Sequence, residues 1–322
     1  MTTLRKSLAA YLELRRGMGF KLRYYERRLG RFLSFVEERG TKKITTQLAI
    51  QFATYDSDLK PRTMAGRLSE VRGFARFQLA HDPATEVPPR HLLANTGRPA
   101  KAHIYSEIEI VRLLQAARNQ PELHRFPGPL WPRWRGSLWY CYFGLLAMTG
   151  MRLSEVRHLR DADIDWQESV LTIRQAKFGK SRLVPLHATM LQALRAYIAH
   201  RDRFFAEFLP RTILQHLFVS TRGTALGVTA VNRQFRRVSH HVGLRGPNDR
   251  RGPRLHDLRH RFAVETLLRW YREGEEPERL LPVLSTYLGH TRVSCTYWYL
   301  RCTPELMAAA SHRLERRWKG IK

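Results

Sequence analysis

The sequence predicts a mainly α-helical protein with one small antiparallel β-sheet, an α+β fold divided into two domains. Apolar residues recur at helical spacing along most of the chain, and three short strand-like segments lie close together in its second half. A stretch rich in proline and glycine interrupts the helical pattern around residues 81–101. With 322 residues, the chain is long enough for two domains that each bury a core.

The first domain is predicted over residues 1–82 as a basic, all-helical unit. In its second helix Leu29 and Leu33 recur at helical spacing, while Arg27 lies on another face. The four expected helices span residues 3–16, 21–38, 46–55 and 61–80. The prolines after residue 82 cannot sustain a helix, so residues 83–101 are predicted to form a linker.

The second domain is predicted over residues 102–322 as a mixed unit that contains the sheet. Its three short strands, at residues 163–166, 170–175 and 182–186, are joined by tight turns. The expected helices span residues 106–119, 136–148, 188–207, 229–242, 258–271, 282–288 and 305–318, with short helices from residue 153 and around residue 296.

The charge of the chain indicates a polyanionic partner. It carries 56 basic and 28 acidic side chains, a net charge of +28. The first 100 residues hold 19 basic and 9 acidic side chains, and the remainder hold 37 and 19, so we expect both halves to contact the partner. Arginine outnumbers lysine 46 to 10, which suits bidentate contacts to phosphate oxygens, although a bias of the genome would give the same ratio.

The composition argues against a secreted, metal-binding or membrane protein. The chain has three cysteines, Cys141, Cys295 and Cys302, an odd number without metal-ligand spacing. Basic residues interrupt the apolar residues at its start, and the longest apolar stretch, residues 136–151, is shorter than the roughly 18–20 residues that span a bilayer. We therefore expect a cytoplasmic protein without a cofactor or a metal ion.

Arg152 is the first candidate for contact with a phosphate. It follows Thr149-Gly150, which ends one predicted helix, and it precedes another helix whose backbone N–H groups would also favour an anion. The alternative is that Arg152 only forms a salt bridge with Glu155 or caps a turn.

His256 and Arg259 form a second candidate, because their i, i+3 spacing places a proton carrier and a cation one helical turn apart. An ordinary surface helix of a basic protein would show the same spacing. Lys177 and Lys180 flank the second turn of the sheet, and a lysine can donate a proton where an arginine cannot. The alternative for this pair is a hairpin tip that its charge keeps soluble.

The segment from His290 to Tyr299 contains two tyrosines, and a phenol close to several cations can act as a nucleophile. Aromatic residues at such spacing often fill a core instead, and Tyr297 or Trp298 could do so here.

Together, in this order, four segments resemble the tyrosine recombinases, also called the phage-integrase superfamily. They are TGMRLSEV, KFGKSRLVPL, HDLRHRFA and LGHTRVSCTYWY, and the resemblance covers residues 104–303. It implies a two-domain, C-shaped clamp on DNA. The first domain resembles the core-binding domain of the family in position, helicity and charge.

The resemblance also implies roles for the candidate residues. Arg152 and Arg259 would hold the nonbridging oxygens of the scissile phosphate, and His290 would donate a hydrogen bond to it. Tyr299, nine residues after His290, would attack the phosphorus, whereas Tyr297 lies two residues too early. Lys177 would be the general acid for the 5′ oxygen, and His256 would assist proton transfer.

The chain departs from the family pattern at three places, Cys295, Trp298 and the unusual segment 127–135. A metal-dependent nuclease would instead need clustered carboxylates. The nearest approach to such a cluster, Asp161, Asp163 and Asp165, alternates like one edge of the sheet.

The expected function is site-specific DNA recombination through a covalent 3′-phosphotyrosyl link and a Holliday junction. The expected assembly on two double-stranded sites is a tetramer, of this chain alone or with related recombinase subunits. A role in the integration or transposition of a mobile element is preferred, at the nucleoid. The alternatives are a catalytically inactive DNA-binding protein and an enzyme of the type IB topoisomerase kind. The last helix, with Leu306, Met307, Ala310 and Leu314, is expected to pack either on a neighbouring subunit or within the chain.

Overall fold

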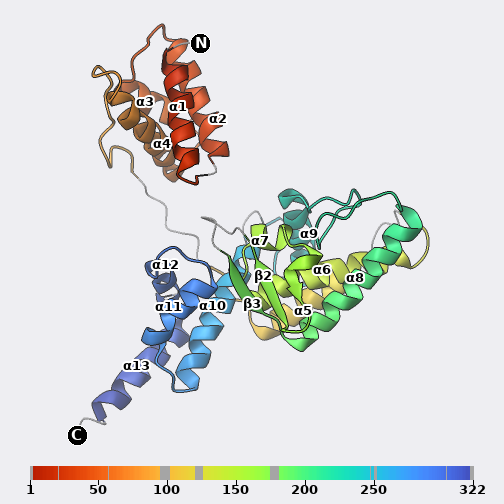
Figure 1. The fold of residues 1–322 in the computed structure, drawn as a ribbon. Coiled ribbons are helices and arrows are strands. Elements are labelled where there is room, and N and C mark those ends of the chain that lie inside the picture. Colours follow the sequence, from red (N-terminus) through yellow and green to blue (C-terminus); the bar gives the residue numbers. More distant parts are fainter. Residues whose placement is uncertain are drawn as a thin grey trace. The chain divides into compact units, whose positions relative to one another are not determined.

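The computed structural model describes residues 3–20, 22–56, 58–94, 102–119, 126–174, 181–246, 248–249, 252–301 and 303–319. Within these residues the protein is mostly helical and contains one three-stranded antiparallel sheet, which confirms the predicted fold class (Figure 1). The chain divides into two compact units, Met1–Ala100 and Lys101–Lys322.

The first unit consists of four helices around a core of aromatic and aliphatic side chains. The helices are α1 (Thr3–Gly17), α2 (Arg23–Glu37), α3 (Thr46–Thr54) and α4 (Pro61–Leu79). Phe32, Leu33 and Phe74 are fully buried in this core. Local signals set the helix starts, since the Thr45 side chain accepts a hydrogen bond from the Leu48 backbone and Pro61 occupies the first turn of α4.

Of the predicted linker, residues 83–101, the structure describes those up to residue 94, and they contact the first unit. The guanidinium of Arg72 donates hydrogen bonds of 2.7 Å to the carbonyl oxygens of Pro88 and Pro89. The Glu86 backbone N–H donates to the Ile44 carbonyl over 2.8 Å. Proline prevents a helix here but leaves carbonyl acceptors, so the segment forms an extended strap on the bundle.

The second unit has nine helices among its described residues, two 3₁₀ turns and the sheet. The helices are α5 (Glu107–Arg118), α6 (Leu130–Thr149), α7 (Leu153–Arg157), α8 (Ala188–Phe208), α9 (Val228–His241), α10 (Leu255–Arg272), α11 (Pro277–Tyr287), α12 (Ser294–Tyr297) and α13 (Pro304–Lys319). The 3₁₀ turns are η1 (Asp161–Asp163) and η3 (Trp298–Arg301).

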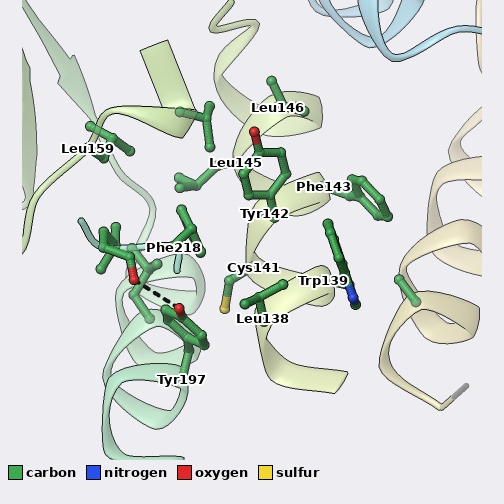
Figure 2. Close-up of a cluster of buried hydrophobic side chains, with 14 of the residues drawn as sticks. Leu138, Trp139, Cys141, Tyr142, Phe143, Leu145, Leu146, Leu159, Tyr197 and Phe218 are labelled. Carbon is green, nitrogen blue, oxygen red and sulfur yellow. Dashed lines mark hydrogen bonds between the residues drawn. The ribbon is translucent and has the colours of Figure 1, made fainter. Parts of the chain in front are cut away.

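Helix α6 is the centre of the main core, where it contacts α5, α8 and α10 (Figure 2). Its side chains Trp139, Tyr142 and Phe143 are buried together, and the hydroxyl of the nearby Tyr197 donates a hydrogen bond of 2.8 Å to the Leu217 carbonyl. Because most side chains of α6 are buried, apolar residues lie around most of the helix and no wide polar stripe marks it in the sequence.

The predicted start of α6 at residue 136 was wrong, since the helix begins at Leu130. Pro132 signalled a break in the sequence, but it lies in the first turn, where the missing N–H costs no helical hydrogen bond. The unusual segment therefore contributes to the core, with the ring of Trp134 stacked on Phe204 at a centroid distance of 4.4 Å.

The sheet has the order β1 (Ile164–Asp165), β2 (Val170–Ile173), β3 (Arg182–Pro185), with Ile173 paired with Arg182. The three aspartates are not one edge of the sheet as predicted, because two of them lie in η1. There Asp161 pairs with Arg201 at 2.6 Å, and Asp163 pairs with Arg174 at 2.8 Å. Lys177 and Lys180 lie outside the described residues.

A second core in this unit joins α10, α11 and α13. Val264, Leu267, Leu284 and Leu306 are buried in it together with Tyr299. Across the described part of the chain, no helix is long and apolar enough to cross a membrane.

Candidate active site

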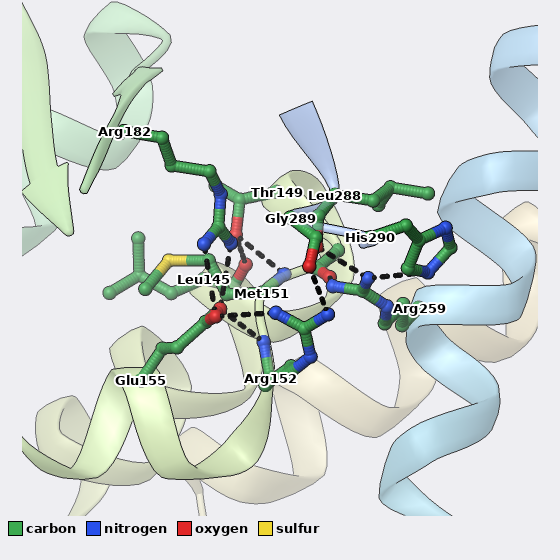
Figure 3. Close-up of polar contacts among 11 residues, drawn as sticks. Leu145, Thr149, Met151, Arg152, Glu155, Arg182, Arg259, Leu288, Gly289 and His290 are labelled. Carbon is green, nitrogen blue, oxygen red and sulfur yellow. Dashed lines mark hydrogen bonds and ion pairs between the residues drawn. The ribbon is translucent and has the colours of Figure 1, made fainter. Parts of the chain in front are cut away.

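The site lies where the end of α6, the start of α7, α10 and the segment after α11 meet. Gly150 ends α6 with a φ of +59°, and a Cβ atom there would lie 2.6 Å from Cδ1 of Phe262. Glycine therefore permits both the left-handed turn and the approach of α10. This turn places Arg152 at the start of α7, facing Arg259 of α10 (Figure 3).

Arg152 is held by both a carboxylate and a backbone carbonyl. Its Nη1 donates to Oε1 of Glu155 over 2.9 Å, and its Nη2 donates to the Gly289 carbonyl over 2.6 Å. The Arg152 backbone N–H also donates to Oε2 of Glu155, at 2.8 Å. The salt bridge considered as an alternative is thus present, and it lies in the same site as Arg259.

Arg259 is almost completely buried, with 2% of its surface exposed. Its Nη1 donates to the Gly150 carbonyl over 2.8 Å, and its Nη2 donates to the Leu288 carbonyl over 2.6 Å. Burial lowers the pKa of Arg259, and the nearby Tyr299 opposes this shift. Carbonyl oxygens at both ends of the guanidinium fix the direction of its remaining N–H groups.

His290 accepts a hydrogen bond from Arg259, whose Nη2 lies 2.9 Å from its Nε2. A guanidinium can only donate, so Nε2 is the unprotonated nitrogen and Nδ1 carries the proton. Nδ1 lies 2.9 Å from Oγ1 of Thr296, which can accept that proton in a hydrogen bond. Burial, followed by the charges of Arg259 and Arg152, lowers the pKa of His290 to about 4. The imidazole is therefore neutral near pH 7.

Tyr299 lies in the same site, with 3% of its surface exposed. Its ring is nearly parallel to that of His290 at a centroid distance of 6.0 Å, and it lies 5.4 Å from the ring of His260. Tyr297, by contrast, is 52% exposed. Helix α12 ends at Tyr297, and Tyr299 lies in the following turn η3, so the two side chains point in different directions. The side chain of Tyr299, and not that of Tyr297, lies beside the arginines.

His256 lies at the exposed start of α10, and its ring centroid is 4.6 Å from that of His260. The pKa of His256 is lowered, first by loss of surrounding water and then by the charge of Arg259. His260 is buried, and the pKa of its ring falls to about 4, because of burial first and then the neighbouring His256. Lys177, the sixth predicted site residue, lies outside the described residues.

Sequence reasoning assigned no role to Arg182, Thr296 or His260, and it treated Glu155 only as an alternative partner of Arg152. Arg182 contacts Glu155 through two nitrogens, with distances of 2.9 and 2.7 Å. The i, i+3 spacing of Arg152 and Glu155 was the available signal for one half of this cluster. The pairing with Arg182 needed the tertiary structure. Within the described part of the chain, no group of three or more His, Cys, Asp or Glu side chains could hold a metal ion.

Comparison with known proteins shows which family and which solved structures the chain is similar to. A model of the phage integrase family matches residues 107–305. The chain is 47% identical over 319 residues to the putative integrase/recombinase y4rB of Sinorhizobium fredii, covering 99% of each chain. It is 34% identical to y4rE of the same organism, covering 96% of this chain and 95% of the relative.

Two solved structures share the fold at low sequence identity. The integrase of the transposon Tn1549, in complex with transposon right end DNA, has a TM-score of 0.65 at 16% identity and covers 96% of this chain and 98% of its own. The XerH site-specific recombinase bound to its palindromic difH substrate has a TM-score of 0.60 at 20% identity, covering 84% and 70%.

Proposed function

Because the chain belongs to the phage integrase family, the tyrosine recombinases, we propose that it cleaves and rejoins DNA at specific sites through a covalent 3′-phosphotyrosyl intermediate. The observation that carries the proposal is the cluster of Arg152, Arg259, His290 and Tyr299 in one site. Its cations can compensate the charge that gathers on the nonbridging oxygens of a phosphodiester in the transition state.

In the proposed reaction Tyr299 Oη attacks the phosphorus and the bond to the 5′ oxygen breaks. The 5′ oxygen takes a proton from Lys177, and His256 assists the departure of the phenol proton. The lowered pKa of His256 favours its neutral form, which can accept that proton. A freed 5′-hydroxyl can attack the same linkage, so rejoining reverses cleavage and conserves the energy of the phosphodiester.

His290 has to change its hydrogen bonds before it can donate one to the phosphate. In this structure its Nε2 accepts from Arg259, an arrangement in which it cannot donate. An arriving phosphate would accept from Arg259 and favour protonation of His290, since the anion offsets the nearby cations. We therefore assign His290 to binding of the charged transition state.

The decisive test is covalent trapping. A DNA site with a nick close to the cleavage point loses the short strand after cleavage, so the protein–DNA adduct accumulates and survives denaturant. We expect this adduct with the wild type and with Tyr297→Phe, but none with Tyr299→Phe. An adduct with Tyr299→Phe that disappears in Tyr297→Phe would move the nucleophile, and no adduct from any cognate site would indicate an inactive DNA-binding protein.

Two further measurements separate the alternatives. We expect cleavage to persist in EDTA, since the proposed steps use side chains alone, and activity that only Mg²⁺ restores would contradict the mechanism. A type IB topoisomerase would relax any supercoiled plasmid, whereas a recombinase needs its paired sites.

We propose further that the enzyme works as a tetramer on two duplex sites, through a Holliday junction, in the cytoplasm at the nucleoid. Helix α13 supports an intersubunit contact, because Leu306 is buried against α10 while Met307 and Leu314 remain 56% and 54% exposed. Replacing Met307 and Leu314 with serine should reduce pairing of two sites while leaving half-site cleavage intact. Integration or transposition of a mobile element is the proposed role, tested by adduct formation with DNA from the borders of the encoding locus.

A further inference from the structure

Arg182 and Arg152 share one buried carboxylate. Each oxygen of Glu155 accepts from both arginines: Oε1 lies 2.9 Å from Nη1 of Arg152 and from Nη1 of Arg182. Oε2 lies 2.8 Å from the backbone nitrogen of Arg152 and 2.7 Å from Nη2 of Arg182. The side chains of Glu155 and Arg182 are only 4% and 10% exposed, so solvent screens this pair weakly.

We propose that Arg182 is a positioning residue for the recombinase reaction, acting through Glu155 on the guanidinium of Arg152. The inference rests on the proposed function and adds a residue to its machinery. Arg182 holds the carboxylate in a fixed orientation, which leaves Arg152 free to direct its Nη2 toward the carbonyl of Gly289 and the phosphate site.

The charges around Glu155 support this role for Arg182. Three guanidiniums, those of Arg152, Arg182 and Arg259, lie close enough to His290 for each to lower its pKa, and Glu155 is the carboxylate between two of them. Without Arg182, the buried Glu155 would turn fully toward Arg152, because an unpaired buried charge is costly. Arg152 would then be drawn away from Gly289, and much of its charge would be neutralised.

The turn at Gly289 shows how closely the two arginines approach this point. The residue has a φ of +66°, and a Cβ atom there would lie 3.0 Å from Nη1 of Arg152 and 3.1 Å from Nη1 of Arg182. Both guanidiniums thus pack beneath the same turn, one residue before His290. A displacement of either one is transmitted to the segment that carries His290.

Arg174 provides a matched control. It follows the last residue of β2, as Arg182 begins the paired strand β3, and it forms its own ion pair of 2.8 Å with Asp163. Its side chain is 65% exposed, however, and its partner is no part of the site. Arg174→Ala therefore removes an arginine and an ion pair from the same hairpin without touching Glu155.

The experiment measures single-turnover cleavage of the nicked substrate at saturating DNA. We expect Arg182→Ala to slow cleavage about 10- to 100-fold, the cost of a displacement of about 1 Å in a catalytic group, while DNA affinity stays within about twofold. Arg182→Lys, which keeps the charge but loses the two-point contact, should fall between. Arg174→Ala should cleave like the wild type. Equal rates for Arg182→Ala and Arg174→Ala would overturn the proposal.

Modified phosphates distinguish positioning of Arg152 from general support of the fold. A methylphosphonate at the scissile position removes the charge that Arg152 meets, so the defect of Arg182→Ala should shrink on it. A 5′-bridging sulfur is a good leaving group without a general acid, so it should restore Lys177→Ala but not Arg182→Ala. Restoration of Arg182→Ala by sulfur, or a defect of the same size on all three phosphates, would overturn the proposal.

Folding and the proposed chemistry are controlled separately. The Glu155→Gln variant removes the shared charge, and its cleavage should fall as that of Arg182→Ala does; a wild-type rate would contradict the inference even if Arg182→Ala failed to fold. An adduct with the wild type and an unaltered rate for Arg182→Ala would refute only this inference. The absence of any wild-type adduct would refute the proposed function as well.

Discussion

The two units carry a similar excess of positive charge per residue, but they differ in how exposed their arginine side chains are. In the first unit Arg27, Arg31 and Arg62 are exposed on α2 and α4, and the ion pair between Arg16 and Glu26 is half-exposed. In the second unit Arg259 and Arg201 are buried, and backbone carbonyls accept from both. Exposed arginines attract any polyanion, whereas buried ones are oriented before a substrate arrives.

The difference follows from the cost of burying charge. An exposed arginine keeps its water and needs no partner, so its position on a helix is set only by the need to keep polar residues outside. A buried guanidinium must have acceptors, and the turns at Gly150 and Leu288 supply them to Arg259. The buried guanidiniums of the second unit therefore depend on particular backbone geometry, and the exposed ones of the first unit do not.

The largest expected effect is that of Arg259→Ala. Loss of two oriented donors to a phosphate should slow single-turnover cleavage at saturating DNA by at least about 10²–10³-fold. Arg31→Ala, in the first unit, should weaken DNA binding in a salt-dependent manner, with a change of about 0.9 in the slope of log K against log salt, and leave that rate unchanged. An equal loss of cleavage rate in Arg259→Ala and Arg31→Ala would contradict the predicted difference between buried and exposed arginines.

The second prediction concerns glycine in the two units. Gly150→Ala should lower the free energy of unfolding by about 2–4 kcal/mol, because its positive φ strains alanine and the new methyl group meets Phe262. In α2, Gly30 has no atom within 4 Å of an added Cβ, so Gly30→Ala should stabilise by about 0.5–1 kcal/mol. Denaturant titration of the full chain measures both, and destabilisation by Gly30→Ala would contradict the contrast.

The third prediction concerns a difference in the response to acid. His260 and His290 titrate near 6.5 when unfolded but near pH 4 in the folded site, so the unfolded chain binds more protons between these values. Acidification through this window should destabilise the second unit, by at most about 1.4 kcal/mol per pH unit for each histidine. In the first unit burial raises the pKa of Glu70, which adds a contribution of opposite sign.

Hydrogen exchange from pH 7 to 4.5 can resolve the two units within the intact chain. The groups around His260 are His256, Asp257, Arg254 and Arg259, and Trp298 and Tyr299 cover its ring. His260→Gln, which does not titrate, should flatten the loss of protection in the second unit. An equal loss of hydrogen-exchange protection in both units would contradict the predicted difference in their response to acid.

The helices of the first unit were predicted well, because the residues that mark their starts and ends lie next to those helices in the sequence. Helix α4 begins at Pro61 as expected and ends one residue before the expected Ala80. Helix α6 was harder to predict, since a mostly buried helix lacks a wide polar face and Pro132 looks like an interruption although it occupies the first turn.

The candidate site was predictable where one motif contains both partners, as with Arg152 and Glu155. The contact between Arg182 and Glu155 joins residues 27 positions apart, and no spacing rule reaches that far. The choice of Tyr299 over Tyr297 came from the resemblance alone. In the structure the two phenols differ in burial, with Tyr299 buried and Tyr297 exposed.

The passage from α12 into η3 limits how the segment after His290 can change. A helical residue turns the chain by about 100°, so removal of a single residue between Thr296 and Tyr299 would rotate a different side chain toward His290. Surface substitutions along this stretch leave that orientation intact, whereas a change of length does not. The number of residues between Thr296 and Tyr299 is therefore under stricter constraint than the identity of the exposed Tyr297 and Trp298.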